Sequence, residues 1–469
     1  MEWEKVIGLE IHVELATATK IFCGCSTAFG GDPNTRCCPV CMGMPGALPV
    51  FNKKVLEYAV KAGLAFNCDI ARNNRFDRKN YFYPDLPKAY QISQLYMPFA
   101  RNGYIDIETA GKKKRIGIHE IHMEEDAGKL IHSETSDETY PDYNRCGVPL
   151  IEIVTEPDFS EADEVIAFLE RIKSDLQYMG VSDCKMQEGS IRCDVNLSVR
   201  KKGDKPGTRT EMKNLNSFKA IERAIEYEAK RQKRLLERGE SIIQETRRWD
   251  DARGEGMAMR SKENAQDYRY FPEPDIPPIV ISEELILRLK SEQPELASEK
   301  KKRYTERFGL SAYDAELLTR DKAVADIFEQ TTELVNEPKE AANWLLCQSA
   351  LEKMNISPCV FAEFIGIITA GRVNRSIGRE IFAHVFSEGD DFDVNRYITD
   401  NNLGMIDDEA AIYDTVRKVL AANPSVVEEY NSGKTKVFGF LVGQCMRELK
   451  GKAAPELVNK AVKELLYAP

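Results

Sequence analysis

At 469 residues the chain is too long for one ordinary hydrophobic core, so we expect two to four domains. Hydrophobic residues make up 42 % and charged residues 30 %, and no run approaches the roughly 18 unbroken apolar residues of a membrane helix. The net charge of −11 argues against a broadly basic nucleic-acid-binding surface. The twelve cysteines, without a secretory signal at the start, predict reduced thiols and a cytoplasmic location.

Polar and apolar residues alternate in residues 8–15. A strand here would place Glu10, His12 and Glu14 on one face and four apolar side chains on the other. This pattern predicts a strand with one chemically active face.

The segment His122–Asp126 repeats this theme, because an imidazole and three carboxylates occur within five residues. Such a cluster suits Mg²⁺, which takes oxygen ligands and commonly acts beside a phosphate substrate. The alternative is a solvated acidic face, which is what many charge runs are.

Two cysteine pairs lie within residues 23–41. Cys23 and Cys25 are separated by twelve residues from Cys38 and Cys41, which is the arrangement of a structural Zn²⁺ site with four thiolate ligands. Cys37 adjoins Cys38 and competes with it as a ligand, but the Cys-x-x-Cys spacing favours Cys38. The alternatives are unligated thiols and a catalytic cysteine.

Several regular elements are expected along the chain. A helix is predicted over residues 52–65 with Asn52 as its N-cap, and Ser160–Asp163 has the form of a capping box that opens a second helix. Residues 191–200 alternate strictly, which predicts a half-buried strand whose polar face includes Asp194.

Residues 72–99 lack clear periodicity and predict a long ordered loop, a type of segment that is often functional. The Pro-rich residues 270–278 mark the expected edge of the first domain, after which helical periodicity dominates. We therefore predict domains over residues 1–292, 293–406 and 407–469.

Two local patches are basic. Residues 200–234 hold twelve Lys/Arg against five Asp/Glu, an excess of seven, and include part of a helix predicted over residues 217–238. Residues 431–469 hold seven against three, an excess of four. Each patch is either a nucleic-acid contact or a solvated helix face.

Common signatures are missing from the sequence. It has neither a G-x-x-x-x-G-K-[ST] phosphate loop nor a G-x-G-x-x-G fingerprint, so any ATP must be bound in another way. It also has no G-x-S-x-G elbow and no Gly/Ser-rich amidase segment. The chain is therefore poorly equipped to hydrolyse an amide alone.

Together the motifs resemble the B-subunit family of the tRNA-dependent aspartyl/glutamyl amidotransferases, the GatB/GatE family. The resemblance covers essentially the whole chain. It is carried by the segments Gly8–Val13, Phe22–Cys25, Cys38–Cys41, Pro45–Val50, Arg78–Asp85, His122–Gly128, Asp142–Arg145, Gly147–Glu152, Met186–Ser190, Gly207–Glu211, Lys213–Phe218 and Asp267–Pro274.

The resemblance implies an α+β fold. Its first domain would be a catalytic cradle around a mixed, largely antiparallel sheet, followed by an all-α helical domain and an α-helical YqeY-like tail that binds tRNA.

The implied activity is that of a ligase that uses ATP and Mg²⁺. It phosphorylates the side-chain carboxylate of Glu on tRNA(Gln) or Asp on tRNA(Asn), and ammonia then displaces the phosphate. The implied assembly is a heterotrimer in which an amidase (A) subunit supplies ammonia through a channel and a small (C) subunit holds the two large ones together. The alternative is a non-catalytic member of such a complex that serves only tRNA binding or assembly.

The resemblance also assigns roles to individual residues. The implied catalytic residues are Glu10, His12, Glu124, Glu125, Glu152 and Asp194. Of these, Glu10, His12 and Glu125 are expected to bind Mg²⁺. The channel is expected to involve Lys79 and Lys88. The expected tRNA-binding residues of the tail are Lys434, Lys436, Lys450 and Lys452.

Overall fold

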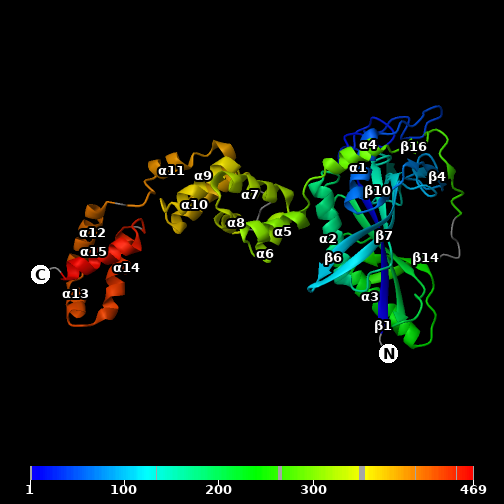
Figure 1. The fold of residues 1–469 in the computed structure, drawn as a ribbon. Coiled ribbons are helices and arrows are strands. Elements are labelled where there is room, and N and C mark those ends of the chain that lie inside the picture. The colour runs from blue at the N-terminus through cyan, green and yellow to red at the C-terminus, as the bar shows by residue number, and fades with distance from the viewer. Residues whose placement is uncertain are drawn as a thin grey trace. The chain divides into compact units, whose positions relative to one another are not determined.

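The structure is a computed structural model, and it describes residues 3–133, 135–261, 267–347, 354–406, 408–449 and 451–467. The chain divides into two compact units, Met1–Leu296 and Ala297–Pro469. The first contains the strands and the second is helical (Figure 1). The α+β fold class predicted from the resemblance is confirmed.

The main sheet of the first unit has nine strands within the described residues, in the order β14-β13-β12-β11-β1-β10-β7-β6-β2. All neighbours are antiparallel except β12 and β13, so the sheet is mixed and largely antiparallel, as expected. Its strands are β1 (Trp3–Glu14), β2 (Asp69–Ile70), β6 (Ala100–Thr109), β7 (Lys112–Glu125), β10 (Pro149–Thr155), β11 (Ile191–Lys201), β12 (Thr210–Lys213), β13 (Glu245–Asp250) and β14 (Glu255–Ser261).

One face of this sheet is apolar and is covered by helices. The apolar odd-numbered residues 7–13 of β1 are at most 1 % exposed and pack in one hydrophobic cluster with α2 (Ala162–Tyr178) and α3 (Phe218–Glu237). Both helices lie along the same side of the sheet (Figure 1). Because side chains alternate along a strand, Glu10, His12 and Glu14 lie on the opposite face, as predicted.

The helices of the first unit begin at identifiable caps. In α1 (Lys53–Ala65), Asn52 accepts a hydrogen bond from the backbone N–H of Lys54, so the predicted cap is confirmed. The predicted capping box of α2 is displaced by one residue. The N-cap is Glu161, and it is the carboxylate of Glu164, not of Asp163, that accepts from the backbone N–H groups of Ser160 and Glu161.

The prediction of one long loop over residues 72–99 was wrong, because this segment contains three short strands. β3 (Asn73–Asn74) pairs with β16 (Ile279–Val280), while β4 (Asp77–Asn80) lies between β5 (Tyr90–Ser93) and β15 (Phe271–Pro272). A further pair, β8 (Lys129–His132) and β9 (Thr139–Asp142), forms its own two-stranded sheet. α4 (Glu283–Ser291) packs on the same core, beyond the Pro-rich segment.

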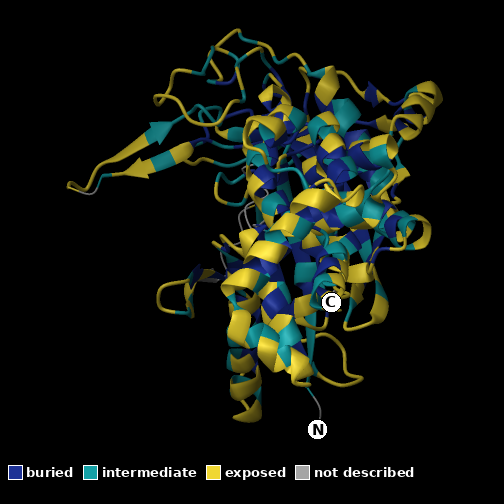
Figure 2. Ribbon diagram, turned by 90° about the vertical axis from the view of Figure 1, so that its left-hand side faces the viewer, coloured by how far each residue is buried: buried dark blue, intermediate teal, exposed yellow. Residues whose placement is uncertain are grey.

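The second unit contains two hydrophobic clusters, one within residues 304–398 and one within 412–462. Most of its helices combine buried and exposed residues (Figure 2). Among the described helices, none is both long and apolar enough to cross a membrane. The elements are α5 (Ala297–Phe308), α6 (Ala312–Thr319), α7 (Lys322–Val335), α8 (Pro338–Leu346), α9 (Pro358–Thr369), α10 (Arg375–Glu388), η3 (Gly389–Asp391), α11 (Val394–Asp400), α12 (Glu409–Ala422), α13 (Pro424–Asn431), η4 (Thr435–Val437), α14 (Phe438–Glu448) and α15 (Pro455–Tyr467).

Candidate functional site

Four neighbouring strands align polar residues on the face of the main sheet opposite α2 and α3. The register pairs His12 on β1 with Arg192 on β11 and with Glu152 on β10. Glu152 is paired in turn with His122 on β7. Directly paired residues share a face of a sheet, so these four side chains form one row across four strands.

His12, Glu124 and Glu152 bring their ligand atoms within 4.8 Å of one another. His12 Nε2 lies 3.6 Å from Glu124 Oε1 and 3.4 Å from Glu152 Oε2. Neighbouring ligands of an ion held at about 2.1 Å lie about 3 Å apart in octahedral geometry, so a small rearrangement would fit this set to Mg²⁺. We call these three residues the His12 cluster.

His122 supports this cluster from the adjacent strand. Its Nε2 lies 3.0 Å from Glu152 Oε2, and its buried Nδ1 makes no hydrogen bond to the described residues and lies 3.8 Å from Glu120 Oε1. Burial would lower the pKa of His122, but the charges and hydrogen bonds of Glu152 and Glu124 outweigh it and raise the pKa to about 10. Burial would raise the pKa of Glu152, but the imidazoles of His122 and His12 outweigh it and hold this pKa well below its usual range. His122 and Glu152 therefore form a charged pair next to His12.

A second group of carboxylates lies beside the first and comprises Glu10, Asp194 and Glu211 on β12. Lys213 contacts Asp194 and donates to Glu211 at 2.9 Å, while Asn196 donates to Glu10 at 2.9 Å. Burial and the charge of Glu152 raise the pKa of Glu10. An ammonium group already neutralises part of this second group.

The structure does not bring Glu125 to Glu10 and His12, contrary to the expected Mg²⁺ site. Glu124 and Glu125 are consecutive residues of β7, so their side chains point to opposite sides of the strand. Glu124 joins His12, whereas the Glu125 carboxylate pairs with Lys88 and accepts from the backbone N–H of Ile92 at 2.9 Å.

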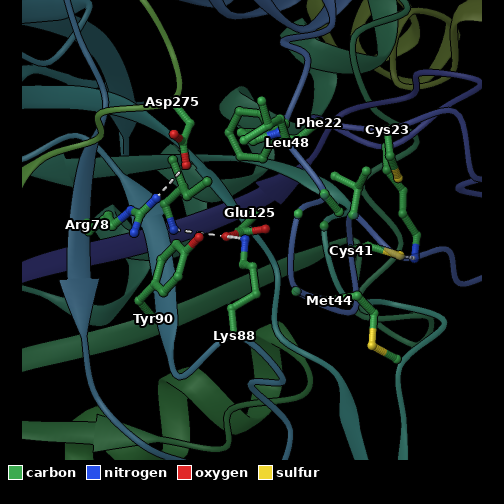
Figure 3. A pocket seen from close by; sticks show the side chains of 18 residues that line it. Phe22, Cys23, Cys41, Met44, Leu48, Arg78, Lys88, Tyr90, Glu125 and Asp275 are labelled. Atoms are coloured by element: carbon green, nitrogen blue, oxygen red, sulfur yellow. Dashed lines mark hydrogen bonds and ion pairs between the residues drawn. The ribbon is translucent and has the colours of Figure 1, made fainter.

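Lys88 and Glu125 meet in a pocket of about 280 Å³ (Figure 3). Arg78 and Asp275 pair on one side of it, and Cys23 and Cys41 lie on the other. Lys79 does not line this pocket, because it alternates with Arg78 along β4. The two expected channel lysines are therefore not together in this pocket, which lies beside the three-stranded sheet of β15, β4 and β5, here called the small sheet.

The four predicted zinc ligands, Cys23, Cys25, Cys38 and Cys41, place their sulfur atoms within 4.8 Å of one another. We call these four residues the cysteine knuckle. Hydrogen bonding from Cys23, with a smaller contribution from the Lys20 ammonium, lowers the pKa of the Cys41 thiol. Lys20 is fully buried, and its Nζ lies 3.7 Å from Cys41 Sγ and 2.8 Å from the carbonyl oxygen of Arg36.

This arrangement fits a tetrahedral thiolate site for Zn²⁺. Cys37 is outside it, with its sulfur 3.8 Å from Asn144 Oδ1.

A larger cavity of about 820 Å³ adjoins the row of charged residues. Its lining includes Glu14, Arg145, Arg192 and Asp194. The Asp126 carboxylate accepts from Arg192 at 2.8 Å and lies 3.4 Å from Arg145 Nε. Burial, followed by the charge of Asp126, raises the pKa of Glu14 to about 7.

The expected tRNA-binding lysines have varied surroundings. Lys436 is exposed, and Lys434 Nζ lies 3.4 Å from the Glu429 carboxylate. Lys452 donates to the carbonyl oxygen of Asn402. Lys450 lies outside the described residues.

Comparison with known protein families identifies the chain. Residues 5–287 match the model of the GatB/GatE catalytic domain, and residues 326–466 match a second model, described as the GatB domain. The chain belongs to the GatB/GatE family. The first match includes every residue of the His12 cluster and of the cysteine knuckle.

Relatives in this family align over nearly the full length. The B subunit of aspartyl/glutamyl-tRNA(Asn/Gln) amidotransferase from Lachnoclostridium phytofermentans is 58 % identical, and that from Agathobacter rectalis is 56 % identical, each over 474 residues. The protein of the same name from Carboxydothermus hydrogenoformans is 50 % identical over 478 residues. Each alignment covers 99 % of this chain and 99 % of the relative, so the resemblance predicted from the motifs is confirmed.

Some residues of the site escaped the sequence prediction. The motif at residues 122–126 contains His122, but the sequence assigned it no role, and Glu211 and Lys213 were missed. The alternation of residues 191–200 had placed Arg192 on a polar face that was a candidate wall of the site, without an individual role for this residue. For Lys213 and Glu211, the pairing of β11 with β12 was needed.

Proposed function

We propose that this chain is the B subunit of a tRNA-dependent amidotransferase, which converts Glu-tRNA(Gln) or Asp-tRNA(Asn) into the corresponding amide. The full-length similarity to relatives of that name supports this role. The single structural observation that carries the chemistry is the convergence of His12, Glu124 and Glu152 from three strands.

The proposed reaction has two steps. A carboxylate is a poor acyl donor, because an oxide ion would have to leave. The carboxylate oxygen of the aminoacyl group therefore attacks the γ-phosphorus of ATP, and ADP leaves. Ammonia then attacks the acyl carbon, inorganic phosphate leaves, and a proton is lost to give the amide. Each step thus has a good leaving group.

Within this scheme His12, Glu124 and Glu152 would hold Mg²⁺, which supplies positive charge to the phosphoryl oxygens when bound. His122 keeps its proton and directs it to Glu152 Oε2, which fixes the orientation of that carboxylate. Arg192, which is held by Asp126, adds a permanent positive charge at the end of the row. These residues position a polyanionic substrate without any Gly-rich phosphate loop.

The Lys88–Glu125 pair suits the passage of ammonia. The buried pair gives this pocket a charged, hydrogen-bonding wall that can interact with ammonia or ammonium. The proposed source of ammonia is an amidase (A) subunit, and a small (C) subunit would complete the heterotrimer. Zn²⁺ at the cysteine knuckle would stabilise the pocket wall.

The tail is proposed to bind the tRNA body. Its excess of four positive charges over residues 431–469 favours contacts with backbone phosphates. Lys434, Lys436, Lys450 and Lys452 are the proposed contributors. A role in translation further supports the proposed cytoplasmic location.

The test is amidation of Glu-tRNA(Gln) by this chain reconstituted with its amidase and small partner subunits. Glu152→Gln removes an anionic ligand and the partner of two imidazoles, so we expect the rate of amidation to fall by about 100-fold or more while tRNA binding is retained. Glu156→Gln is the matched control, because Glu156 is exposed and lies just beyond the end of β10. Undiminished amidation by the Glu152→Gln complex would favour a non-catalytic role in assembly.

A further inference from the structure

A row of tyrosine rings lies on the small sheet of the first unit. The ring centroids of Tyr81 and Tyr268 are 5.8 Å apart, those of Tyr268 and Tyr270 are 6.1 Å apart, and both pairs meet edge to face. Lys79 Nζ lies 5.0 Å from the ring centroid of Tyr268 and 5.8 Å from that of Tyr81. All three rings are half-buried, so they retain accessible surface.

Two distant parts of the sequence build this row. Asn80 donates its backbone N–H to the carbonyl oxygen of Tyr268 at 3.0 Å and its side-chain amide to that of Arg269 at 2.8 Å. Tyr81 continues the pairing of β4 with β5, since its N–H donates to the carbonyl oxygen of Ala89 at 3.2 Å. The rings are therefore held on a hydrogen-bonded framework.

The row faces the His12 cluster. Side chains alternate along β4 and β5, so Lys79 and Tyr81 share a face with Ser93, whose hydroxyl donates to Glu124 at 3.4 Å. The raised pKa of Tyr270, caused by burial and then by the charges of Glu124 and Glu152, agrees with this orientation.

This environment is selective. Carboxylates and the Lys79 ammonium lie near the rings, so a purely apolar ligand is disfavoured because it would desolvate these charges. A flat, polar aromatic ring that carries phosphate satisfies both the tyrosines and Lys79, because nucleobases stack on aromatic side chains and phosphate pairs with ammonium.

We propose that Tyr81, Tyr268 and Tyr270 form a nucleobase-binding wall that receives an adenine ring while the attached reacting group lies at the His12 cluster. This inference rests on the proposed function, because ATP and the 3′-terminal adenosine of an aminoacyl-tRNA both carry adenine. The wall orients the substrate, and its tyrosines take no part in bond making.

The test compares Tyr268→Leu and Tyr81→Leu with Tyr268→Phe, which keeps the ring and removes only the hydroxyl. In the reconstituted heterotrimer we measure KM for ATP at saturating Glu-tRNA(Gln), and KM for Glu-tRNA(Gln) at saturating ATP. Loss of stacking should raise one of these constants by about 5- to 150-fold, and Tyr268→Phe should stay within about two-fold of the parent. An increase in KM for ATP assigns the wall to the nucleotide, and an increase in KM for the tRNA assigns it to the terminal adenosine.

Binding is also measured without turnover, by equilibrium dialysis of the heterotrimer with ATP and with an RNA oligonucleotide that ends in adenosine. If the parent complex fails to amidate yet the leucine variants lose affinity for either probe, the proposed function fails and the wall stands. Unchanged affinities in correctly folded leucine variants, or an equal loss in Tyr268→Phe, overturn the wall itself.

Discussion

Glu14 shows how one residue of the polar row responds to its surroundings. It lines the large cavity beside the His12 cluster, and burial together with the charge of Asp126 raises its pKa to about 7. Its carboxyl group is therefore partly protonated at neutral pH, which lowers the accumulated negative charge on this face of the sheet.

This raised pKa predicts a specific dependence of stability on pH. A carboxyl group whose pKa is higher in the folded state stabilises the fold fully below its unfolded pKa, near 4.5, and that contribution is lost as the pH rises through about 7. The loss amounts to at most about 3 kcal/mol. Glu14→Gln removes this pH-dependent contribution. The melting temperature of the variant minus that of the parent should therefore be larger at pH 8 than at pH 5. Calorimetry at both pH values measures the difference, and an equal difference at both would refute the assignment.

At the residue scale, the sequence predicted on which face of a strand a side chain lies better than which residues of other strands it contacts. Alternation along residues 8–15 was enough to place Glu10 and His12 together on the polar face of the strand. Choosing Glu124 over Glu125 required the register between β7 and β10, which depends on long-range pairing. His122 was hidden for the same reason, because only that register places it opposite Glu152.

At the scale of single elements, the start of α2 provides a sharp test. The Glu164 carboxylate accepts from two backbone N–H groups and pairs with Lys114 at 2.8 Å. We expect Glu164→Ala to lower the free energy of unfolding of the first unit by about 1–2 kcal/mol. Ser160→Ala is the control and should cost less than about 0.5 kcal/mol, because the Ser160 hydroxyl has only a long contact of 3.4 Å with Lys114. Denaturant unfolding measures both, and the reverse order would restore the capping box predicted from Ser160 and Asp163.

Longer elements were predictable and the shortest were not. α1 has 13 residues and β11 has 11, so each is long enough for its hydrophobic periodicity to identify it. β3, β4 and β5 have two to four residues each. β3 pairs with β16, and β4 pairs with β5 and β15. So few residues contain no detectable period, and their strand conformation depends on tertiary pairing.

At the scale of the whole molecule, each unit has its own hydrophobic core. The core of the first unit draws its buried residues from positions 7–289, and those of the second unit from 304–462. The sequence revealed the change to helical texture near residue 291, whereas the contacts divide the chain after Leu296. Buried residues of α4 belong to the first core, and periodicity alone could not assign that helix to either side.

The separate cores predict that residues 1–296 fold without the remainder. A chain of this length buries enough apolar surface for an independent domain, and the His12 cluster and the cysteine knuckle both lie within it. The shortened chain should unfold cooperatively and retain the zinc content of the full-length protein, about one equivalent. Its affinity for tRNA should fall and depend less on salt, because the basic segment 431–469 is missing. Calorimetry, metal analysis and binding titrations at two salt concentrations measure these properties, and an unfolded fragment would show that the second unit is required to complete the first core.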